Sequence, residues 1–590
     1  MRRFLVGLLA VIGFIALLGV GGIVALFTLA DGGRPAPPAR IVLEVDWRQL
    51  PQESTSGGTA LGLDLFGARQ PGLSQTVAQL HRAAADPRVA GMIAVLGDDA
   101  PGLASVQELR DAINVFRTAG KFAIAYTDSF GGGIGALQNY YLATAFEKIW
   151  VQPSGDFAVV GLAAQVPFLK DALDRIGITV EGGRRMEYKT APNSFTETGF
   201  TPAHRENLRQ LLDGLFEQMV NDIASARGVS ASDVRGLIDR APLPAPDAMQ
   251  AKLLDRTLYR DEARGEVLAT AGNGAGLFPL GDYASLPRDG EVSEEAIALI
   301  VATGTIVSSD PEDAPLQSDT LLAADRIVKA IEAAARDGNV KALVVRLDSP
   351  GGSYVASDTL RRALERARAA GKPVIVSIGD VAASGGYFAA LPADVIMAQP
   401  ASITGSIGVF SAKPVVSDLV ESLGINVETL TVGANAAMYS PLHSFTPEQQ
   451  AIVDRQLDRI YRDFTAKVAA ARTLDAARLD QAARGRVFTG AQAKAAGLVD
   501  EMGGLHDAIA LAKVRANIPA SRMVQVRRYP AERDPFDRFM ALLFGDDDRS
   551  PRLAVGAGAS AQALLRRLNA LGLYWHADAM RLPPLPPLWQ

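Results

Sequence analysis

Two glycine-containing turns in the second half of the chain carry the residues best suited to covalent chemistry. Residues 348–353 read Asp-Ser-Pro-Gly-Gly-Ser, and residues 379–387 read Gly-Asp-Val-Ala-Ala-Ser-Gly-Gly-Tyr. In the second turn, Ser384 stands where a helix is expected to begin, so its hydroxyl can act as a nucleophile. In the first, the N–H groups of Gly351 and Gly352 can face a developing oxyanion. Most Gly-Gly turns are only turns, so this pattern is weak by itself.

A serine nucleophile needs a base, and the chain offers few histidines. It has five, and none lies in a glycine-containing turn: His81, His204, His443, His506 and His576. His443 is the only one close enough in sequence to consider, so a Ser-His-Asp arrangement stays open but unsupported. A lysine can serve instead if burial lowers its pKa from about 10.4 toward neutrality.

The chain contains an internal duplication. Val89 matches Val340 at an offset of 251, and Tyr140 matches Tyr387 at an offset of 247. An offset that drifts by only a few residues is hard to obtain by chance, and it predicts a tandem repeat. We expect the two copies to be joined by a polar linker at residues 281–295.

The two copies differ where the chemistry would occur. At the 247 offset, Ser384 is matched by Leu137 and Ser406 by Val159, so the first copy lacks both hydroxyls. Its own distinctive polar residue is Lys189, which an alanine replaces in the second copy. This complementarity predicts one site assembled from both copies, with Ser406 holding the lysine toward the nucleophile. The alternative for Lys189 is a solvated loop lysine.

Helical and strand patterns alternate around these residues. In the second copy, residues 321–335 and 356–370 have helical spacing, whereas residues 342–347 and 373–378 are buried-strand candidates. Alternation of this length is typical of βαβ units, so the predicted fold class is α/β, present twice. Long amphipathic helices are expected at residues 205–226 and 449–471. Open α/β sheets bind ligands at the carboxyl ends of their strands, where both turns would lie.

One segment stands apart from the rest of the chain. Residues 4–30 contain no charged residue and follow Arg2 and Arg3. This run exceeds the roughly 20 residues needed to span a bilayer. It predicts an N-terminal transmembrane helix with a cytoplasmic N-terminus. The alternative is a signal peptide that is removed.

Composition excludes several classes of protein. The 590 residues include 59 Lys and Arg against 65 Asp and Glu, a net charge of −6, which makes binding of nucleic acid a poor hypothesis. The absence of cysteine excludes disulfides, thiolate zinc sites, iron–sulfur clusters and a cysteine nucleophile. We expect no metal and no cofactor.

Taken together, these motifs resemble the signal peptide peptidase A (protease IV) family in its long, two-repeat form. The resemblance rests on residues 188–189, 348–353, 382–387 and 402–408, which occur in the family's order, and it extends to about residue 504. It implies two tandem crotonase/ClpP-like domains in a serine protease of the inner membrane that faces the periplasm. It also implies Ser384 as nucleophile, Lys189 as general base, Ser406 as the residue that orients the lysine, and Gly351 and Gly352 as oxyanion donors. A homotetramer that degrades cleaved signal peptides follows from the same resemblance.

Four parts therefore divide the sequence. They are an anchor at residues 1–30, a first repeat at 31–290, a second repeat at 291–525, and an amphipathic, Pro-rich extension at 526–590. Two other functions stay open at this stage. Crotonase-like domains use paired N–H groups on thioester oxyanions, and a catalytically silent membrane scaffold would need no chemistry at all.

Overall fold

The structure is a computed structural model of the chain. It describes residues 36–53, 72–99, 102–131, 135–287, 293–309, 321–519, 522–530 and 579–581. The segment predicted as the membrane anchor, residues 4–30, lies outside these ranges, as does most of the 526–590 extension. Within the described ranges, no helix is both long and apolar enough to cross a bilayer.

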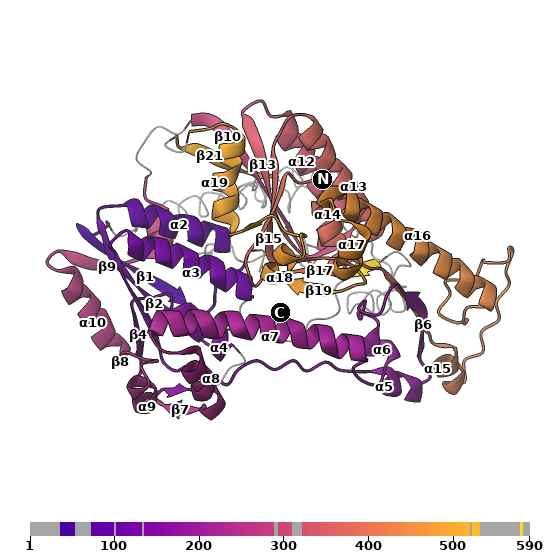
Figure 1. Cartoon of the computed structure of the whole chain (residues 1–590), viewed down its shortest axis with the longest axis horizontal. Helices are drawn as coiled ribbons and strands as arrows, with labels where there is room; N and C mark the ends of the chain where they lie inside the picture. Colours follow the sequence, from indigo (N-terminus) through magenta and orange to yellow (C-terminus); the bar gives the residue numbers. More distant parts are fainter. Residues whose placement is uncertain are drawn as a thin grey trace, which may run out of the picture.

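The first repeat is built on a parallel six-stranded sheet (Figure 1). Its order is β8 (Arg256–Thr257), β4 (Lys148–Val151), β3 (Phe122–Thr127), β2 (Val89–Leu96), β1 (Arg40–Trp47) and β9 (Ala275–Pro279). Helices α2 (Leu73–Ala85) and α3 (Leu103–Thr118) pack on one face, and α10 (Arg260–Ala271) packs on the other. Neighbouring β1 residues alternate between the faces, since Val42 contacts the α10 side and Leu43 the α2 and α3 side.

The second repeat has a related but larger sheet. Its order is β19 (Val487–Thr489), β17 (Ile403–Gly405), β15 (Val374–Ala383), β13 (Val340–Ser349), β10 (Ser293–Thr303) and β21 (Val524–Tyr529), while β16 (Val395–Ala398) pairs with β15 and β20 (Glu501–Met502). Helices α12 (Ala324–Arg336) and α13 (Tyr354–Ala369) cover one face, and α19 (Leu505–Arg515) covers the other. The α/β prediction and the duplication are confirmed.

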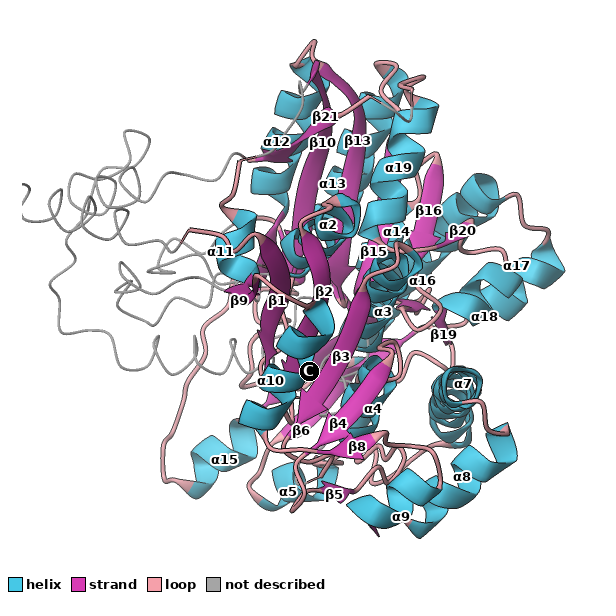
Figure 2. Ribbon diagram, turned by 90° about the vertical axis from the view of Figure 1, so that its left-hand side faces the viewer, coloured by secondary structure: helices cyan, strands magenta, loops and turns pink. Residues whose placement is uncertain are grey.

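The remaining elements lie around the two sheets (Figure 2). In the first repeat they are α4 (Ala136–Ala143), β5 (Asp156–Phe157), α5 (Lys170–Arg175), β6 (Thr179–Arg184), α6 (Asn193–Thr196), α7 (Pro202–Arg227), α8 (Ala231–Arg240), β7 (Leu243–Pro244), α9 (Ala245–Gln250) and α11 (Leu280–Ala284). In the second they are β11 (Thr305–Val307), β12 (Leu321–Ala323), β14 (Gly351–Ser353), α14 (Gly385–Ala390), β18 (Phe410–Val415), α15 (Ser417–Ser422), α16 (Pro447–Arg472), α17 (Ala476–Ala482) and α18 (Gly490–Ala495). A last strand, β22 (Ala579–Arg581), comes from the C-terminal extension.

Equivalent side chains make equivalent contacts in the two repeats. Tyr140 Oη donates to the Leu253 carbonyl at 2.8 Å, and Tyr387 Oη donates to the Leu498 carbonyl at 2.9 Å. The guanidinium of Arg227 pairs with Asp255, as that of Arg472 pairs with Asp500. Each arginine lies near the end of a 26-residue helix, α7 or α16. The repeats therefore share their packing as well as their strand order.

Local structure follows the predicted pattern with three differences. Residues 321–323, predicted as helix, form β12, and α12 begins at Ala324. The turn predicted at 348–353 is much shorter, because Asp348 and Ser349 still belong to β13 and Gly351–Ser353 form β14. The predicted linker at 281–295 is also shorter, since its first residues belong to α11 and its last to β10.

The repeats interlock along an extensive boundary. Strands β6 of the first repeat and β18 of the second pair antiparallel, with Arg184 opposite Phe410. Asn207 on α7 exchanges two hydrogen bonds with the backbone of Val487 on β19, at 2.8 and 2.9 Å. In Figure 1, α7 runs beneath the second repeat toward β6. The carboxyl ends of the second repeat's strands therefore face elements of the first.

A buried ion cluster lies at the same boundary. The Arg346 guanidinium on β13 lies 2.6 Å from a Glu108 carboxylate oxygen and 3.1 Å from a Glu53 carboxylate oxygen. Arg346 has no exposed surface, and Glu108 on α3 is also buried. Burial raises the pKa of Glu108 to about 7, against the opposing effect of Arg346. The arginine therefore holds two carboxylates of the first repeat inside the second.

Replacing Arg346 tests whether this cluster stabilises the contact. We expect Arg346→Met to lower the free energy of unfolding by about 3–5 kcal/mol at pH 8, because it leaves buried carboxylates without a cation. The loss should be smaller at pH 5, where the Glu108 carboxyl, whose pKa is raised by burial, can be protonated. Urea unfolding measures both values. Arg336→Met, which removes an exposed pair with Glu332, should cost under about 1 kcal/mol. Equal losses in the two variants would contradict the assignment.

Candidate active site

Ser384 lies at the junction of β15 and α14. It is the N-cap residue of α14, is fully buried, and has φ 54° and ψ −113°. This left-handed backbone is strained for a serine and is found most often at functional sites. Glycines follow it because a Cβ at Gly385 would lie 2.5 Å from the Ser357 hydroxyl oxygen. The tight turn thus brings α14 directly against β14.

Lys189 reaches Ser384 from the first repeat. It follows β6 and has no exposed surface. Its Nζ lies 2.7 Å from Ser384 Oγ, 3.0 Å from Ser406 Oγ and 3.1 Å from the Ser406 carbonyl oxygen. The structure therefore brings together the three side chains that the repeat comparison selected. Lys189 and Ser384 are 195 residues apart in the sequence.

The surroundings of Lys189 Nζ favour the neutral amine. Burial holds the pKa of Lys189 well below its ordinary value of about 10.5. The hydrogen-bond partners given above are two hydroxyls and one carbonyl, so none of them is an anion that would favour the ammonium form. A neutral amine at hydrogen-bond distance from a serine hydroxyl can accept its proton.

Ser406 is held at the end of β17, next to the strand that carries Ser384. Its φ is 52°, and its N–H donates to the Arg486 carbonyl at 2.6 Å. The Ser384 N–H donates to the Gly405 carbonyl at 2.8 Å. The β15 and β17 pairing therefore fixes the two serines relative to each other.

Gly351 and Gly352 lie on β14 beside the turn that carries Ser384. A Cβ at Gly385 would approach the Gly352 nitrogen to 3.1 Å, which places this turn against the start of α14. Glycine is required at 352 because a Cβ would lie 2.1 Å from the Ile306 carbonyl oxygen. The Gly351 N–H donates to Ser349 Oγ at 3.2 Å. Of the two expected oxyanion donors, Gly351 is therefore already engaged with a side chain.

Asp348 joins the two turns, and sequence reasoning gave it no role. Its carboxylate accepts hydrogen bonds from the N–H groups of Asp380 and Val381, at 3.4 and 3.1 Å. Its own strand leads to Gly351, whereas Val381 lies on the strand that leads to Ser384. Burial, together with the Asp380 carboxylate, raises its pKa. An acidic residue directly before Ser-Pro-Gly-Gly was the signal that could have drawn attention to it.

The equivalent positions of the first repeat hold apolar side chains. Leu137 and Val159, which match Ser384 and Ser406, are buried in the core of that repeat.

The histidines that the structure describes have other partners. His443 is exposed and bonds Thr429, His81 stacks on His506, and His204 lies near Asn193. His576 lies outside the described residues.

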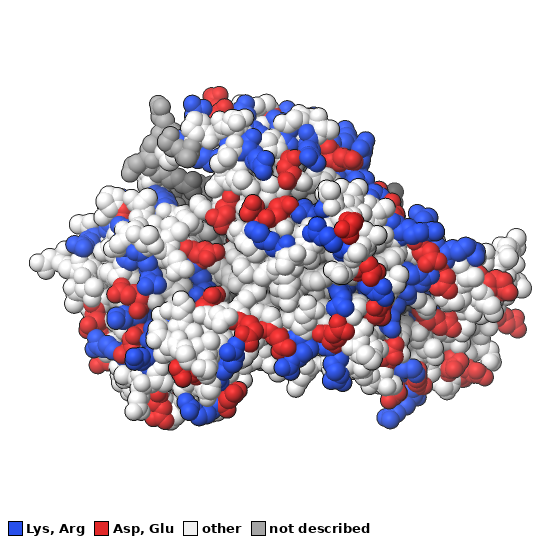
Figure 3. Space-filling view, viewed as in Figure 1, with Lys and Arg blue, Asp and Glu red and all other residues white. Residues whose placement is uncertain are grey.

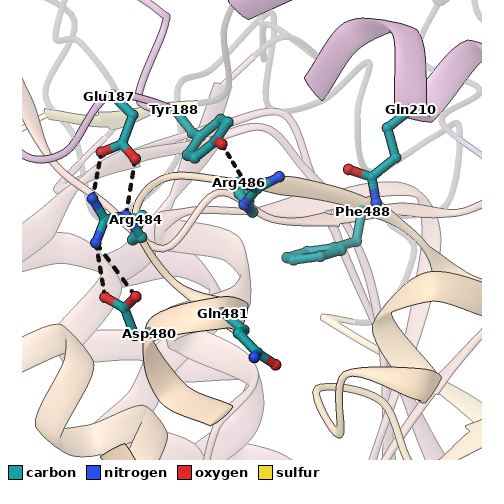
Figure 4. Close-up of a pocket in the computed structure, with 8 residues that line it drawn as sticks. All are labelled: Glu187, Tyr188, Gln210, Asp480, Gln481, Arg484, Arg486 and Phe488. Atoms are coloured by element: carbon teal, nitrogen blue, oxygen red, sulfur yellow. Dashed lines mark hydrogen bonds and ion pairs between the residues drawn. The ribbon is translucent and has the colours of Figure 1, made fainter. Parts of the chain in front are cut away.

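A cavity of about 350 Å³ lies beside the segment that precedes Lys189 (Figure 4). It is lined by Glu187, Tyr188, Gln210, Asp480, Gln481, Arg484, Arg486 and Phe488. The lining comes from both repeats and includes the residue next to Lys189, but not Ser384. Arg484 and Arg486 thus line the cavity, and Gly485 between them lies against the Lys189 backbone.

The comparison with protein families decides the class of the protein. The model of peptidase family S49 matches residues 119–272 and again residues 366–519. The chain belongs to peptidase family S49. Membership identifies it as a serine endopeptidase, and it excludes the thioester enzyme and the silent scaffold as readings of the sequence.

Curated relatives in this family cover most of the chain. "Protease 4" of Salmonella typhi is 30% identical over 86% of this chain and 82% of its own length. "Serine protease SPPA, chloroplastic" of Arabidopsis thaliana is 31% identical over 77% of this chain and 67% of its own length. These relatives confirm the resemblance to the signal peptide peptidase A (protease IV) family.

Solved structures match more weakly. A mutant form of ClpP1 from Listeria monocytogenes is 15% identical, has a TM-score of 0.24, and covers 36% of this chain and 94% of its own. A TM-score this low does not establish a shared fold, so the ClpP-like topology of each repeat stays a prediction.

The pH dependence of stability tests the state of Lys189 independently of activity. Because the folded state holds the amine neutral at a pH where the unfolded chain is protonated, stability should rise with pH from the lowered pKa to about 10.4. Lys189→Met should remove this rise. Each unit by which the pKa is lowered contributes about 1.4 kcal/mol to it.

Chemical unfolding from pH 6 to pH 10 measures the difference between the two proteins. Lys329→Met, at an exposed lysine of α12, is the control and should leave the pH dependence unchanged. A difference between wild type and Lys189→Met that stays constant with pH would mean that Lys189 is not held neutral.

Proposed function

We propose that the chain is a membrane-anchored endopeptidase that uses a Ser-Lys dyad shared between its repeats. The observation that carries the proposal is the 2.7 Å contact between Lys189 Nζ and Ser384 Oγ in a fully buried setting. Ser-Lys pairs are an accepted variant of the serine protease triad. The first repeat supplies the base and the second supplies the nucleophile.

The reaction begins with proton transfer from Ser384 to neutral Lys189. As the serine oxygen bonds to the substrate carbonyl carbon, the Lys189 amine takes the hydroxyl proton. The oxyanion accepts hydrogen bonds from the backbone at Gly352 and Gly351, the latter after exchanging its bond to Ser349. The lysinium then gives its proton to the leaving amine, and the C–N bond breaks. Water attacks the acyl-enzyme with Lys189 as base, and Ser384 is regenerated.

Ser406 orients the lysine in this scheme. Its hydroxyl and carbonyl oxygens both lie within hydrogen-bond distance of Nζ. They accept the hydrogen atoms of the amine, which leaves its lone pair directed at Ser384. The third member of a triad orients the base in the same way, but Ser406 does so as an uncharged residue.

The edge of β14 is suited to binding an extended peptide. Strand β22 of the C-terminal extension pairs with it antiparallel, with Gly352 opposite Met580 and Gly351 opposite Arg581. Addition of a strand to a sheet edge lets main-chain hydrogen bonds supply affinity with little dependence on sequence. A substrate that binds in this way would present a carbonyl next to the start of α14.

The proposed setting is the inner membrane. The uncharged run at residues 4–30 after two arginines supports a single anchor with the catalytic repeats on the periplasmic side. Signal peptides left in the bilayer after cleavage are the proposed substrates, because an anchored protease meets them at the membrane surface.

A homotetramer is also proposed. The loop after α15, at the right-hand end of Figure 1, exposes Leu423, Ile425, Val427, Leu430 and Val432. Elsewhere on this face, basic and acidic side chains are interspersed (Figure 3). A cluster of exposed apolar residues is typical of a surface that another molecule covers.

Substitution of the dyad tests the mechanism. Ser384→Ala and Lys189→Ala should each lower kcat by ~10³-fold or more, because neither partner works without the other. Ser406→Ala should cause a smaller loss. Ser422→Ala, at an exposed serine of α15, is the control and should be as active as wild type.

Two measurements follow the dyad substitutions. Hydrolysis of signal-peptide substrates reports activity, and acylation by a serine-directed probe reports the nucleophile, which should be modified at Ser384. Full activity in either dyad variant would overturn the mechanism.

Truncation of the C-terminal extension tests the peptide-binding edge. A chain ending at residue 576 lacks β22, so substrate no longer competes with it and KM should fall several-fold while kcat is unchanged. A chain ending at residue 582 keeps β22 and should retain the wild-type KM. If both truncated chains have the wild-type KM, substrate does not bind along the β14 edge that β22 occupies.

A further inference from the structure

A short turn of the second repeat lies directly against the catalytic lysine of the first. Residues 484–486 read Arg-Gly-Arg and precede β19. Neither the sequence motifs nor the proposed chemistry uses them. We call this segment the 484–486 turn.

Gly485 is in contact with the Lys189 backbone. A Cβ added to Gly485 would lie 2.4 Å from Lys189 N, 2.7 Å from its Cα and 2.8 Å from its Cβ. These atoms belong to the backbone or its first side-chain carbon, so they cannot move without displacing the lysine. The φ of Gly485 is 85°, which also favours glycine.

Backbone hydrogen bonds tie the turn to both sides of the dyad. The Arg484 carbonyl accepts from the Tyr188 N–H at 3.2 Å, one residue before the lysine. The Arg486 carbonyl accepts from the Ser406 N–H at 2.6 Å, and the Gly485 N–H donates to the Ile407 carbonyl at 2.9 Å. The turn therefore fixes the spacing between the Lys189 backbone and the Ser406 backbone.

The two arginine side chains clamp the same region from the cavity side (Figure 4). Arg484 forms two hydrogen bonds to Glu187, at 2.9 and 3.1 Å, and is also paired with Asp480. The Arg486 guanidinium stacks over the Tyr188 ring, 3.7 Å from its centroid, and lies 3.0 Å from Glu206. The residues on both sides of Gly485 thus hold the two residues that precede Lys189.

Backbone strain is concentrated at the same place. Among the described residues other than glycine, seven have positive φ, and four of them surround the dyad: Met186, Ser384, Ser406 and Arg484. Strained conformations persist only where surrounding contacts determine them. The 484–486 turn supplies such contacts to Lys189 and Ser406.

We propose that the 484–486 turn positions the Lys189 amine across the repeat boundary, with Gly485 as the positioning residue. The proposal rests on the proposed role of Lys189 as base. It assigns to the second repeat a part in holding the base, in addition to supplying the nucleophile. A displaced lysine would lose both its distance to Ser384 Oγ and its exclusion from water.

Gly485→Ala tests the proposal, with Gly371→Ala as a matched control. Gly371 has a φ of 82°, close to that of Gly485, but an added Cβ meets nothing within 4 Å. Both variants place a Cβ on a backbone with nearly the same positive φ, and only Gly485→Ala pushes on Lys189. We expect Gly485→Ala to lower kcat by ~10²-fold with KM nearly unchanged, because small misplacements of a catalytic group have effects of that size. Gly371→Ala should keep the wild-type kcat.

The pH profile provides a readout that a purely structural defect would not move. Water admitted to the amine would raise the pKa of Lys189 toward its ordinary value, so the acid limb of kcat in Gly485→Ala should shift to higher pH. Equal kcat values and pH profiles for Gly485→Ala and Gly371→Ala would overturn the proposal. If Lys189→Ala itself remained active, the proposed function would fail instead, so the two failures are distinguishable.

A second pair of variants decides the question if Gly485→Ala does not fold. Arg484→Gln and Glu187→Gln each break one cross-repeat contact without altering the backbone. Both should lower kcat and shift the acid limb in the same direction, and the double variant should be no worse than the more affected single one. Wild-type kcat and pH profile in both single variants would contradict positioning by the turn.

Discussion

The site depends on burying an amine without a counter-ion. Lys189 is surrounded by hydroxyl, carbonyl and backbone groups, and desolvation alone lowers its pKa. Lys413, only a few residues beyond Ser406, differs in having a counter-ion. Its amine lies 3.8 Å from the Glu181 carboxylate, which opposes the effect of burial on its pKa. A carboxylate near Lys189 would favour the ammonium form, so the amine stays neutral only if its polar contacts come from uncharged groups.

The duplicated fold meets this requirement with unequal repeats. The first repeat replaces both serines with apolar residues, Leu137 and Val159, which pack in its core. It contributes the lysine from the segment after β6, and β6 is in turn fixed by pairing with β18 of the second repeat. The buried Arg346, Glu108 and Glu53 cluster holds the same boundary from another side. One repeat thus carries the lysine of the proposed dyad, and the other carries both serines.

Much of this arrangement was predictable from the sequence, and the limits have physical reasons. Ser384, Ser406 and Lys189 were selected because aligned repeats reveal which polar residues lack a counterpart, and helical periodicity located α7 and α16 to within three residues. The β6 and β18 pairing was missed, because contacts between strands so far apart leave no local pattern. Gly485 was missed for a similar reason: the need for glycine there comes from Lys189, almost 300 residues earlier, and not from its own turn.

Residues of both repeats exclude solvent from Lys189. Gly408 and Gly485 of the second repeat approach its Cδ and its backbone so closely that added Cβ atoms would lie 3.1 and 2.4 Å away. Its own repeat contributes the chain that carries it, but the two serine hydroxyls and both glycines come from the other. Desolvation is the cause of the lowered pKa, and it requires residues of both repeats. The lowered pKa of Lys189 is therefore a property of the repeat interface. The proposed site therefore needs both repeats, because the Lys189 amine is desolvated only where the two copies meet.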